Sequence, residues 1–392
     1  MNETNHLPLD MDRALLVGRV WRSGSRGGPS VVVVRDGQVL DISRYAHTMA
    51  DLLDRDDCVE FVRQLPADVI CPVDELMHRS LNRAAGSEAA VLCAPCDLQV
   101  VKASGVTFLV SLLERIIEEK AGGNSAEARA IRDSLQASIG TELSAVRPGS
   151  ETARQLKEAL VQRGEWSQYL EVAIGPDAEI FSKAPPMASV GQGALIGLHP
   201  DSRWSNPEPE IVLAVDSQGR AKGATLGNDV NLRDIEGRSA LLLGRAKDNN
   251  GSCAIGPFIR LFDGHFTLDS VRRAEVALLI EGADGFRLEG VSHMEQISRD
   301  PLDLVAQAYG DHHQYPDGFM LFLGTMFSPV KDRGSPGAGF THHLGDVVTI
   351  SSPLLGALVN EVQLSTEIPR WTFGIRALYR NLAVRGLLAD DG

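Results

Sequence analysis

The chain has 392 residues, 43% of them hydrophobic and 23% charged, which is the composition of a globular protein with a sizeable core. Its formal net charge of −14 argues against nucleic acid or an anionic membrane as a partner, because both attract basic surfaces. The sequence shows neither a secretion signal nor a membrane-spanning run, and its five cysteines suggest buried thiols, so a cytoplasmic protein is expected.

The first 95 residues are expected to form a small α+β domain. Strand-like runs over 15–20, 30–34 and 38–43 predict strands, and Asp36-Gly37 predicts a hairpin turn between the last two. Residues 48–65 are typical of one or two short helices. The rest of the chain, 96–392, is then the second domain.

A helical segment opens this second domain. Residues 108–121 carry an apolar stripe at helical spacing, and Gly122-Gly123 should end the helix. Further helices are predicted from Asn124 onward and over 151–163. This insertion, about 115–165, is either a mobile cover over a site or a solvated helical excursion.

From residue 166 onward the pattern changes to short strands and turns rich in glycine and proline. The predicted strands are 171–175, 209–215, 224–230, 239–244, 275–282, 285–292, 318–327, 346–352 and 356–364. Helices are expected at about 293–308 and 371–383. Many strands with few helices predict a β-rich α+β fold, with mixed sheets rolled into a barrel-like core.

Three acidic residues at the ends of two predicted strands indicate a metal site. Glu208 and Glu210 are two residues apart, so in a strand they share one face, which continues inward as Val212 and Ala214. Like charges on a buried face repel each other, and Asp229 adds a third carboxylate after the next strand. Hard cations such as Mg²⁺, Mn²⁺ or Ca²⁺ prefer such oxygen ligands. The alternative is a strand edge with solvated glutamates.

Two basic residues follow the acidic ones in the sequence. Lys247 lies in the stretch RAKDNN, and Arg233 precedes Asp234. Arg233 could pair with Asp234 on the surface, or it could bind the carboxylate of a substrate with both of its terminal nitrogens.

The combination of these motifs resembles the fumarylacetoacetate hydrolase family over roughly residues 97–392. The matching pieces are Glu208 and Glu210, Asn228-Asp229 with Arg233-Asp234, Lys247, the Phe181-x-Lys183-x-Pro185 signature, Leu323-Gly324-Thr325 and Gly345-Asp346. Within this family, stretches such as LQVVKASGVTFLVSLLERIIEE, NPEPEIV and GNDVNLRDIEGRSALLL are similar to 2-keto-3-deoxypentonate dehydratases.

The resemblance implies a Mg²⁺-dependent hydro-lyase, with Mn²⁺ or Ca²⁺ as possible substitutes. It acts on a 2-oxo acid, 2-keto-3-deoxy-D-xylonate or arabinonate, and yields 2,5-dioxopentanoate and water in pentose catabolism. Glu208, Glu210 and Asp229 would bind the metal ion. Glu114 is implied as the acid/base group, and Lys247 as the group that stabilises the enolate oxygen. The implied substrate-binding residues are Arg233, Thr325, Ser104 and Lys183. A cytoplasmic homo-oligomer, a dimer or a tetramer, is also implied.

One departure from the family pattern affects the predicted chemistry. Ser111 stands where many hydrolases of the family have the histidine that activates water, and Glu114 stands where they have its glutamate partner. A serine without a partner is no base at neutral pH, which disfavours the alternative of a hydrolase for acylpyruvate-type diketo acids. Glu118 or Glu119 could replace Glu114 as the acid/base. A non-catalytic metal- or metabolite-binding protein is the second alternative.

The histidine doublets His312-His313 and His342-His343 are interpreted mainly as loop residues, because neighbours in an extended chain point to opposite sides. The likeness around HQYPDGF could bring His313 near the pocket.

Overall fold

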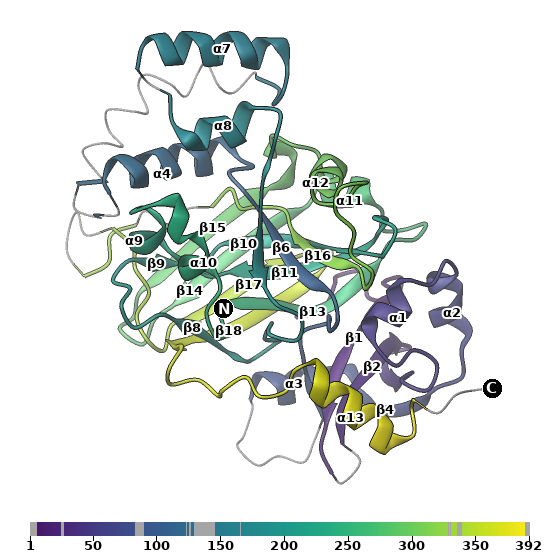
Figure 1. Ribbon diagram of the computed structural model, residues 1–392. Coiled ribbons are helices and arrows are strands. Elements are labelled where there is room, and N and C mark those ends of the chain that lie inside the picture. The colour runs from purple at the N-terminus through teal and green to yellow at the C-terminus, as the bar shows by residue number, and fades with distance from the viewer. Residues whose placement is uncertain are drawn as a thin grey trace.

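The computed structural model describes residues 6–24, 27–82, 90–122, 124, 127–128, 146–164, 166–327, 329, 331–334 and 339–388. Two β-sheets form the centre of the molecule, and helices cover its ends (Figure 1). This agrees with the β-rich α+β fold that the sequence predicts.

The larger sheet has 11 strands and runs from the N-terminal unit into the centre of the chain. Its strands, in spatial order, are β4 (Asp68–Pro72), β3 (Gln38–Asp41), β2 (Gly28–Arg35), β1 (Leu16–Arg22), β13 (Cys253–Leu261), β11 (Ala221–Asp229), β10 (Pro209–Val215), β16 (Phe319–Phe322), β6 (Val100–Gly105) and β7 (Glu179–Ala184), while β5 (Val91–Leu92) pairs with β1. Within the described ranges β4 does not pair with β7, so the predicted barrel is not closed.

A second sheet of five strands packs against the centre of the first. Its order is β15 (Arg287–His293), β14 (Glu275–Glu281), β17 (Val347–Ser352), β18 (Gly356–Leu364) and β8 (Leu195–Leu198). Apolar side chains of β10, β11 and β16 meet those of β14, β17 and β18 in the main hydrophobic core. A two-stranded ladder pairs β9 (Ser205–Asn206), which precedes β10 in the chain, with β12 (Asn231–Leu232), which follows β11.

Helices lie at both ends of this pair of sheets (Figure 1). They are α1 (Met49–Leu53), α2 (Cys58–Gln64), α3 (Val73–Leu81), α4 (Leu109–Lys120), α7 (Glu151–Gln162), α8 (Gln168–Ile174), α9 (Arg233–Glu236), α10 (Leu243–Lys247), α11 (Leu268–Arg272), α12 (Pro301–Ala308) and α13 (Ile375–Arg385), with the 3₁₀ turns η1 (Ala240–Leu242) and η2 (Met294–Gln296). Among the helices that the structure describes, none has the length and hydropathy that crossing a membrane requires.

The N-terminal unit shares the large sheet with the rest of the chain. Strand β1 pairs with β13, so the backbone hydrogen bonds continue across the boundary predicted near residue 95. Helices α1 and α2 pack on this part of the sheet. The division into domains 1–95 and 96–392 therefore stays a prediction.

A helical layer contains the described part of the predicted insertion, about 115–165, and extends beyond it on both sides. Helices α4, α7 and α8 pack around a small apolar core of their own and lie together at the end of the molecule opposite α1 and α2 (Figure 1). The helix predicted from Asn124 falls largely outside the described residues.

Two predicted strands are helical in the structure. Residues 171–175 belong to α8, because the Ser167 side chain accepts a hydrogen bond from the Tyr169 amide and starts a helix that packs on α4. Residues 239–244 form η1 and the start of α10, because Ser239 caps η1 in the same way. A short apolar run fits either structure, and packing decides between them. Strands β4 to β9, β12 and β13 were not predicted from the sequence.

A single substitution tests the central position of β10. Leu213 is fully buried between β11 and β16, so Leu213→Ala should leave a cavity and lower the free energy of unfolding by roughly 2–5 kcal/mol. The matched control is Leu241→Ala, since Leu241 is 95% exposed and its truncation should change the free energy by less than about 0.5 kcal/mol. Urea denaturation measures both, and equal losses would contradict the assigned core.

Candidate functional site

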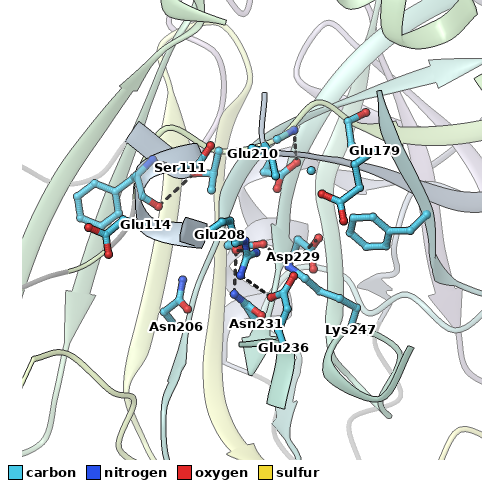
Figure 2. A pocket seen from close by; sticks show the side chains of 18 of the residues that line it. Ser111, Glu114, Glu179, Asn206, Glu208, Glu210, Asp229, Asn231, Glu236 and Lys247 are labelled. Atoms are coloured by element: carbon cyan, nitrogen blue, oxygen red, sulfur yellow. Dashed lines mark hydrogen bonds and ion pairs between the residues drawn. The ribbon is translucent and has the colours of Figure 1, made fainter. Parts of the chain in front are cut away.

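The three predicted acidic ligands meet at the end of the β10–β11 pair. The antiparallel register sets Pro209 opposite Asn228, which brings Glu208 next to Asp229, and the Asp229 amide donates to the Glu208 carbonyl at 3.1 Å. One carboxylate oxygen from each of Glu208, Glu210 and Asp229 lies within 4.8 Å of the others, and all three residues are buried (Figure 2). This acidic triad could hold a divalent cation.

Cationic and amide groups surround the acidic triad and offset part of its charge. The Lys247 ammonium at the end of α10 lies 2.5 Å from Glu208 and 3.4 Å from Asp229, and Lys183 of β7 lies 2.8 Å from Asp229. Glu210 accepts a hydrogen bond only from the Gly324 amide, at 2.6 Å, among the contacts found in the described ranges. Glu210 is therefore the carboxylate with the least compensation.

Because the nearby positive charge is unequal, the pKa values of Glu210 and Asp229 shift in opposite directions. Burial raises the pKa of Glu210 well above its usual value, and the nearby charges of Asp229 and Glu208 raise it further. Burial would also raise the pKa of Asp229, but Lys183 and Lys247 outweigh this effect and lower it. Lys247 is buried too, yet the carboxylates around it raise its pKa above the usual value. Lys247 is thus a permanent cation in this site.

A cavity opens beside the acidic triad, between the sheet and α4. Several segments of the chain contribute side chains to its wall: Ser104 of β6, Ser111, Glu114, Arg115 and Glu118 of α4, Glu179 and Phe181 of β7, Asn206 of β9, Asn231 of β12, and Thr325 and Phe327 after β16. The cavity has a volume of about 30 Å³ in this conformation. A cation and little else would fit without movement of the wall.

Ion pairs attach α4 to the wall of this cavity. Arg115 lies 2.8 Å from Glu118, 3.0 Å from Glu208 and 2.5 Å from Glu236 of α9. Because three carboxylates share this one guanidinium, burial still raises the pKa of Glu236, to about 7. Arg233 of α9 lies 2.9 Å from Glu114 and 2.5 Å from Glu118, which completes a buried network between the two helices.

The structure separates the predicted catalytic and substrate-binding residues into two groups. Ser104, Thr325, Glu114 and Lys247 line the cavity. Arg233 and Lys183 are fully buried behind the wall, where they pair with carboxylates. Of the two alternatives for Arg233, the surface pair with Asp234 is not formed, because Asp234 instead accepts hydrogen bonds from Ser202 and the Arg203 amide. The substrate-binding roles of Arg233 and Lys183 stay predictions.

Sequence reasoning missed the residue whose chemistry stands out most. In the described part of the chain no hydrogen bond or ion pair reaches the carboxylate of Glu179, which lies against Gly105 in the cavity wall (Figure 2). A side chain at position 105 would overlap this carboxylate, so the glycine makes room for it. Burial raises the pKa of Glu179. The sequence did contain a signal for this residue, because Glu179, Phe181 and Lys183 occupy every second position of one strand and therefore share a face.

The histidines contribute nothing to the cavity wall in the described ranges. His313 stacks on Tyr315, and His342 is buried against Asp346, with 3.1 Å between Nδ1 and the carboxylate. Ser111 does line the cavity, but its hydroxyl donates to the Phe108 carbonyl at 2.8 Å.

The fold is that of the fumarylacetoacetate hydrolases. A fumarylacetoacetate hydrolase from psychrophilic Exiguobacterium antarcticum superposes with a TM-score of 0.51 over 90% of this chain and all of its own, at 17% identity. A 2-keto-3-deoxy-D-arabinonate dehydratase superposes better, with a TM-score of 0.61 over 89% of this chain and 99% of its own, at 21% identity. A second structure of that name, complexed with magnesium and 2,5-dioxopentanoate, gives 0.60.

Two curated proteins are similar to this chain in sequence. A "2-dehydro-3-deoxy-D-arabinonate dehydratase" of Saccharolobus solfataricus is 31% identical over 48% of this chain and 60% of its own length. A "Probable 2-keto-3-deoxyxylonate dehydratase" of Haloferax volcanii is 29% identical over 54% of this chain and 68% of its own. No family model matches the chain. The resemblance to the fumarylacetoacetate hydrolase family, and within it to the 2-keto-3-deoxypentonate dehydratases, is confirmed.

The raised pKa of Glu210 leads to a prediction about metal binding. Because its pKa is raised, the Glu210 carboxyl group must lose any proton it carries when a cation binds, so Mg²⁺ or Mn²⁺ binding should be accompanied by proton release. Calorimetry in two buffers of different ionisation enthalpy measures this release, which should shrink as the pH rises through the Glu210 pKa.

The Glu210→Gln variant should bind the cation at least about 10-fold more weakly, without the proton release. Glu281→Gln is the matched control, because Glu281 lies exposed beside Arg287 and should bind metal as the native chain does. Unchanged affinity in Glu210→Gln would remove Glu210 from the ligand set.

Proposed function

We propose that the protein is a divalent-cation-dependent dehydratase that converts a 2-keto-3-deoxypentonate, the D-xylonate or D-arabinonate form, into 2,5-dioxopentanoate and water. The observation that carries this proposal is the buried acidic triad with Lys247 beside it and an unpaired carboxyl, Glu179, across the same cavity. The printed names of both curated relatives support the substrate class.

Glu208, Glu210 and Asp229 would hold the cation, with Mg²⁺ favoured and Mn²⁺ or Ca²⁺ as possible substitutes. When bound, such a cation supplies Lewis-acid chemistry that makes the protons next to a 2-keto group more acidic. Lys247 cannot act as a base, because its pKa is raised and its proton is held by Glu208 and Asp229. Its role is to stabilise negative charge as it develops on the keto oxygen.

Glu179 suits the acid/base role better than Glu114. A carboxyl group that moves a proton must be able to change its hydrogen bonds, and Glu179 is held by none of those found in the described ranges. Glu114 is ion-paired with Arg233 at 2.9 Å, so its carboxylate is already held by another residue. Burial raises the pKa of Glu179, which makes it a stronger base. The predicted role of Glu114 becomes the alternative.

In this mechanism Glu179 takes a proton from C3, and the C4–O bond breaks with its electron pair passing to oxygen. The leaving hydroxyl takes up a proton from the protonated carboxyl and departs as water. Tautomerisation then moves two hydrogens from the C5 carbinol to C3 and C4 and gives the aldehyde of 2,5-dioxopentanoate. Ser104 and Thr325 lie on the cavity wall where they could orient the substrate.

The alternative function, hydrolysis of an acylpyruvate-type diketo acid, requires a group that activates water. Within the described ranges the cavity wall contains no histidine, and the Ser111 hydroxyl is bound to a backbone carbonyl. A non-catalytic binding protein would have no need of the unpaired carboxyl of Glu179. The dehydratase function therefore explains more of the residues in the cavity wall than either alternative does.

We also propose that the protein acts as a cytoplasmic homo-oligomer, a dimer or a tetramer, as the family resemblance implies. Size-exclusion chromatography with light scattering tests the assembly.

The purified protein with Mg²⁺ should turn over 2-keto-3-deoxypentonate, measured as the appearance of the aldehyde, and lose activity when EDTA removes the cation. Acylpyruvate should release no pyruvate. Pyruvate release from acylpyruvate without any reaction on the deoxy acid would overturn the dehydratase.

Two matched variants separate the candidate acid/base groups. Glu179→Gln keeps the shape of the side chain but cannot exchange a proton at neutral pH, so kcat should fall roughly 10²- to 10⁴-fold. Glu114→Gln removes one partner of Arg233, so its main effect should be lower stability, by roughly 1–3 kcal/mol, rather than a loss of that size in kcat. The reverse pattern would restore Glu114 as the acid/base group.

A further inference from the structure

Two asparagines in the cavity wall are unexplained by the mechanism above. Asn206 of β9 and Asn231 of β12 are direct partners in the two-stranded ladder, so their side chains come from neighbouring backbone positions. Both are at least 98% buried, both line the cavity, and Figure 2 shows them on the same side of the acidic triad.

The hydrogen bonds of the two amides fix which way each one points. The Asn231 NH₂ group donates to the Glu208 carboxylate at 3.1 Å, and the Asn206 NH₂ group donates to the Pro207 carbonyl at 2.9 Å. A carboxylate or a carbonyl oxygen can only accept, so the NH₂ end of each amide must face it. The carbonyl end of each amide is therefore the one left for another partner.

Neither of these two oxygens has a donor. Asn206 Oδ1 and Asn231 Oδ1 are buried and receive no hydrogen bond within the described ranges. A buried acceptor without a donor is destabilising, and native proteins rarely retain one without a reason. Two such acceptors at paired positions beside one cavity can accept hydrogen bonds from the hydroxyl groups of a ligand.

We infer that Asn206 and Asn231 form a hydroxyl-binding subsite for the end of the substrate chain distant from the keto acid. This inference rests on the proposed function, which supplies a substrate with hydroxyls at C4 and C5. The C4 hydroxyl leaves and needs a proton donor, which an amide oxygen is not. The C5 hydroxyl stays until tautomerisation and can donate its single hydrogen to one of the two amide oxygens or share it between them, so the subsite recognises the terminal hydroxyl.

The test compares two substrates that differ only at C5: 2-keto-3-deoxypentonate and its 5-deoxy analogue, 4-hydroxy-2-oxopentanoate, which keeps the leaving group. For the native enzyme the ratio of their kcat/KM values should be roughly 10 to 100 in favour of the pentonate, because the analogue cannot donate the hydrogen bond of the C5 hydroxyl to the amide oxygens. In Asn206→Leu, which keeps the volume but cannot accept, the ratio should fall several-fold towards 1.

Asn82→Ala is the matched control, because Asn82 is an exposed amide at the end of α3, away from the cavity, and its loss should leave the ratio unchanged. Calorimetric Mg²⁺ affinity shows whether Asn206→Leu keeps the acidic triad intact. Asn206→Ala gives a smaller side chain for the same measurement if the leucine variant fails to fold.

The outcomes separate this inference from the function on which it rests. Equal kcat/KM on both substrates for the native enzyme, or a ratio that survives in a folded Asn206 variant, would overturn the subsite alone. No turnover of either substrate by the native enzyme would overturn the proposed function and the subsite with it.

Discussion

Three carboxylates confined within 4.8 Å of one another in the protein interior impose the main physical constraint on this structure. Their mutual repulsion and lost hydration must be offset by nearby positive charge. The antiparallel register of β10 and β11 creates the cluster, while β7 and α10 supply Lys183 and Lys247. Glu210 receives the least compensation, and its raised pKa shows that the protein alone does not balance the cluster. A bound divalent cation would complete the balance.

A second set of buried charges connects the helical layer to this site. Arg115 of α4 contacts Glu208 of the acidic triad and Glu236 of α9, and Arg233 of α9 contacts Glu118 of α4. Breaking a buried pair by removing one partner is strongly destabilising, so these contacts fix where α4 sits. The same helix forms one wall of the cavity, through Ser111, Glu114, Arg115 and Glu118.

The polar groups around the cavity are of two kinds: paired groups that stabilise the fold, and unpaired groups that a substrate could bind. Arg233, Lys183 and Glu118 have their charges fully paired. The carboxylate of Glu179 and the amide oxygens of Asn206 and Asn231 have no hydrogen-bond partner in the described part of the chain. Unpaired buried groups cost stability, and enzymes retain them where a substrate completes the bonding. The proposed acid/base group and hydroxyl subsite are both of this second kind.

The sequence by itself determined the strands that carry the metal ligands, because alternation along Glu208, Glu210 and Val212 is a local property of one strand. It also determined the helix of α4 and the N-terminal hairpin. It did not determine the secondary structure of residues 171–175 and 239–244, because these short apolar runs are helical through capping and packing. Only the tertiary structure decided which charged residues face the cavity. Glu114 and Arg233 lie 119 positions apart, and their pairing follows from the packing of α4 on α9, which no local pattern encodes.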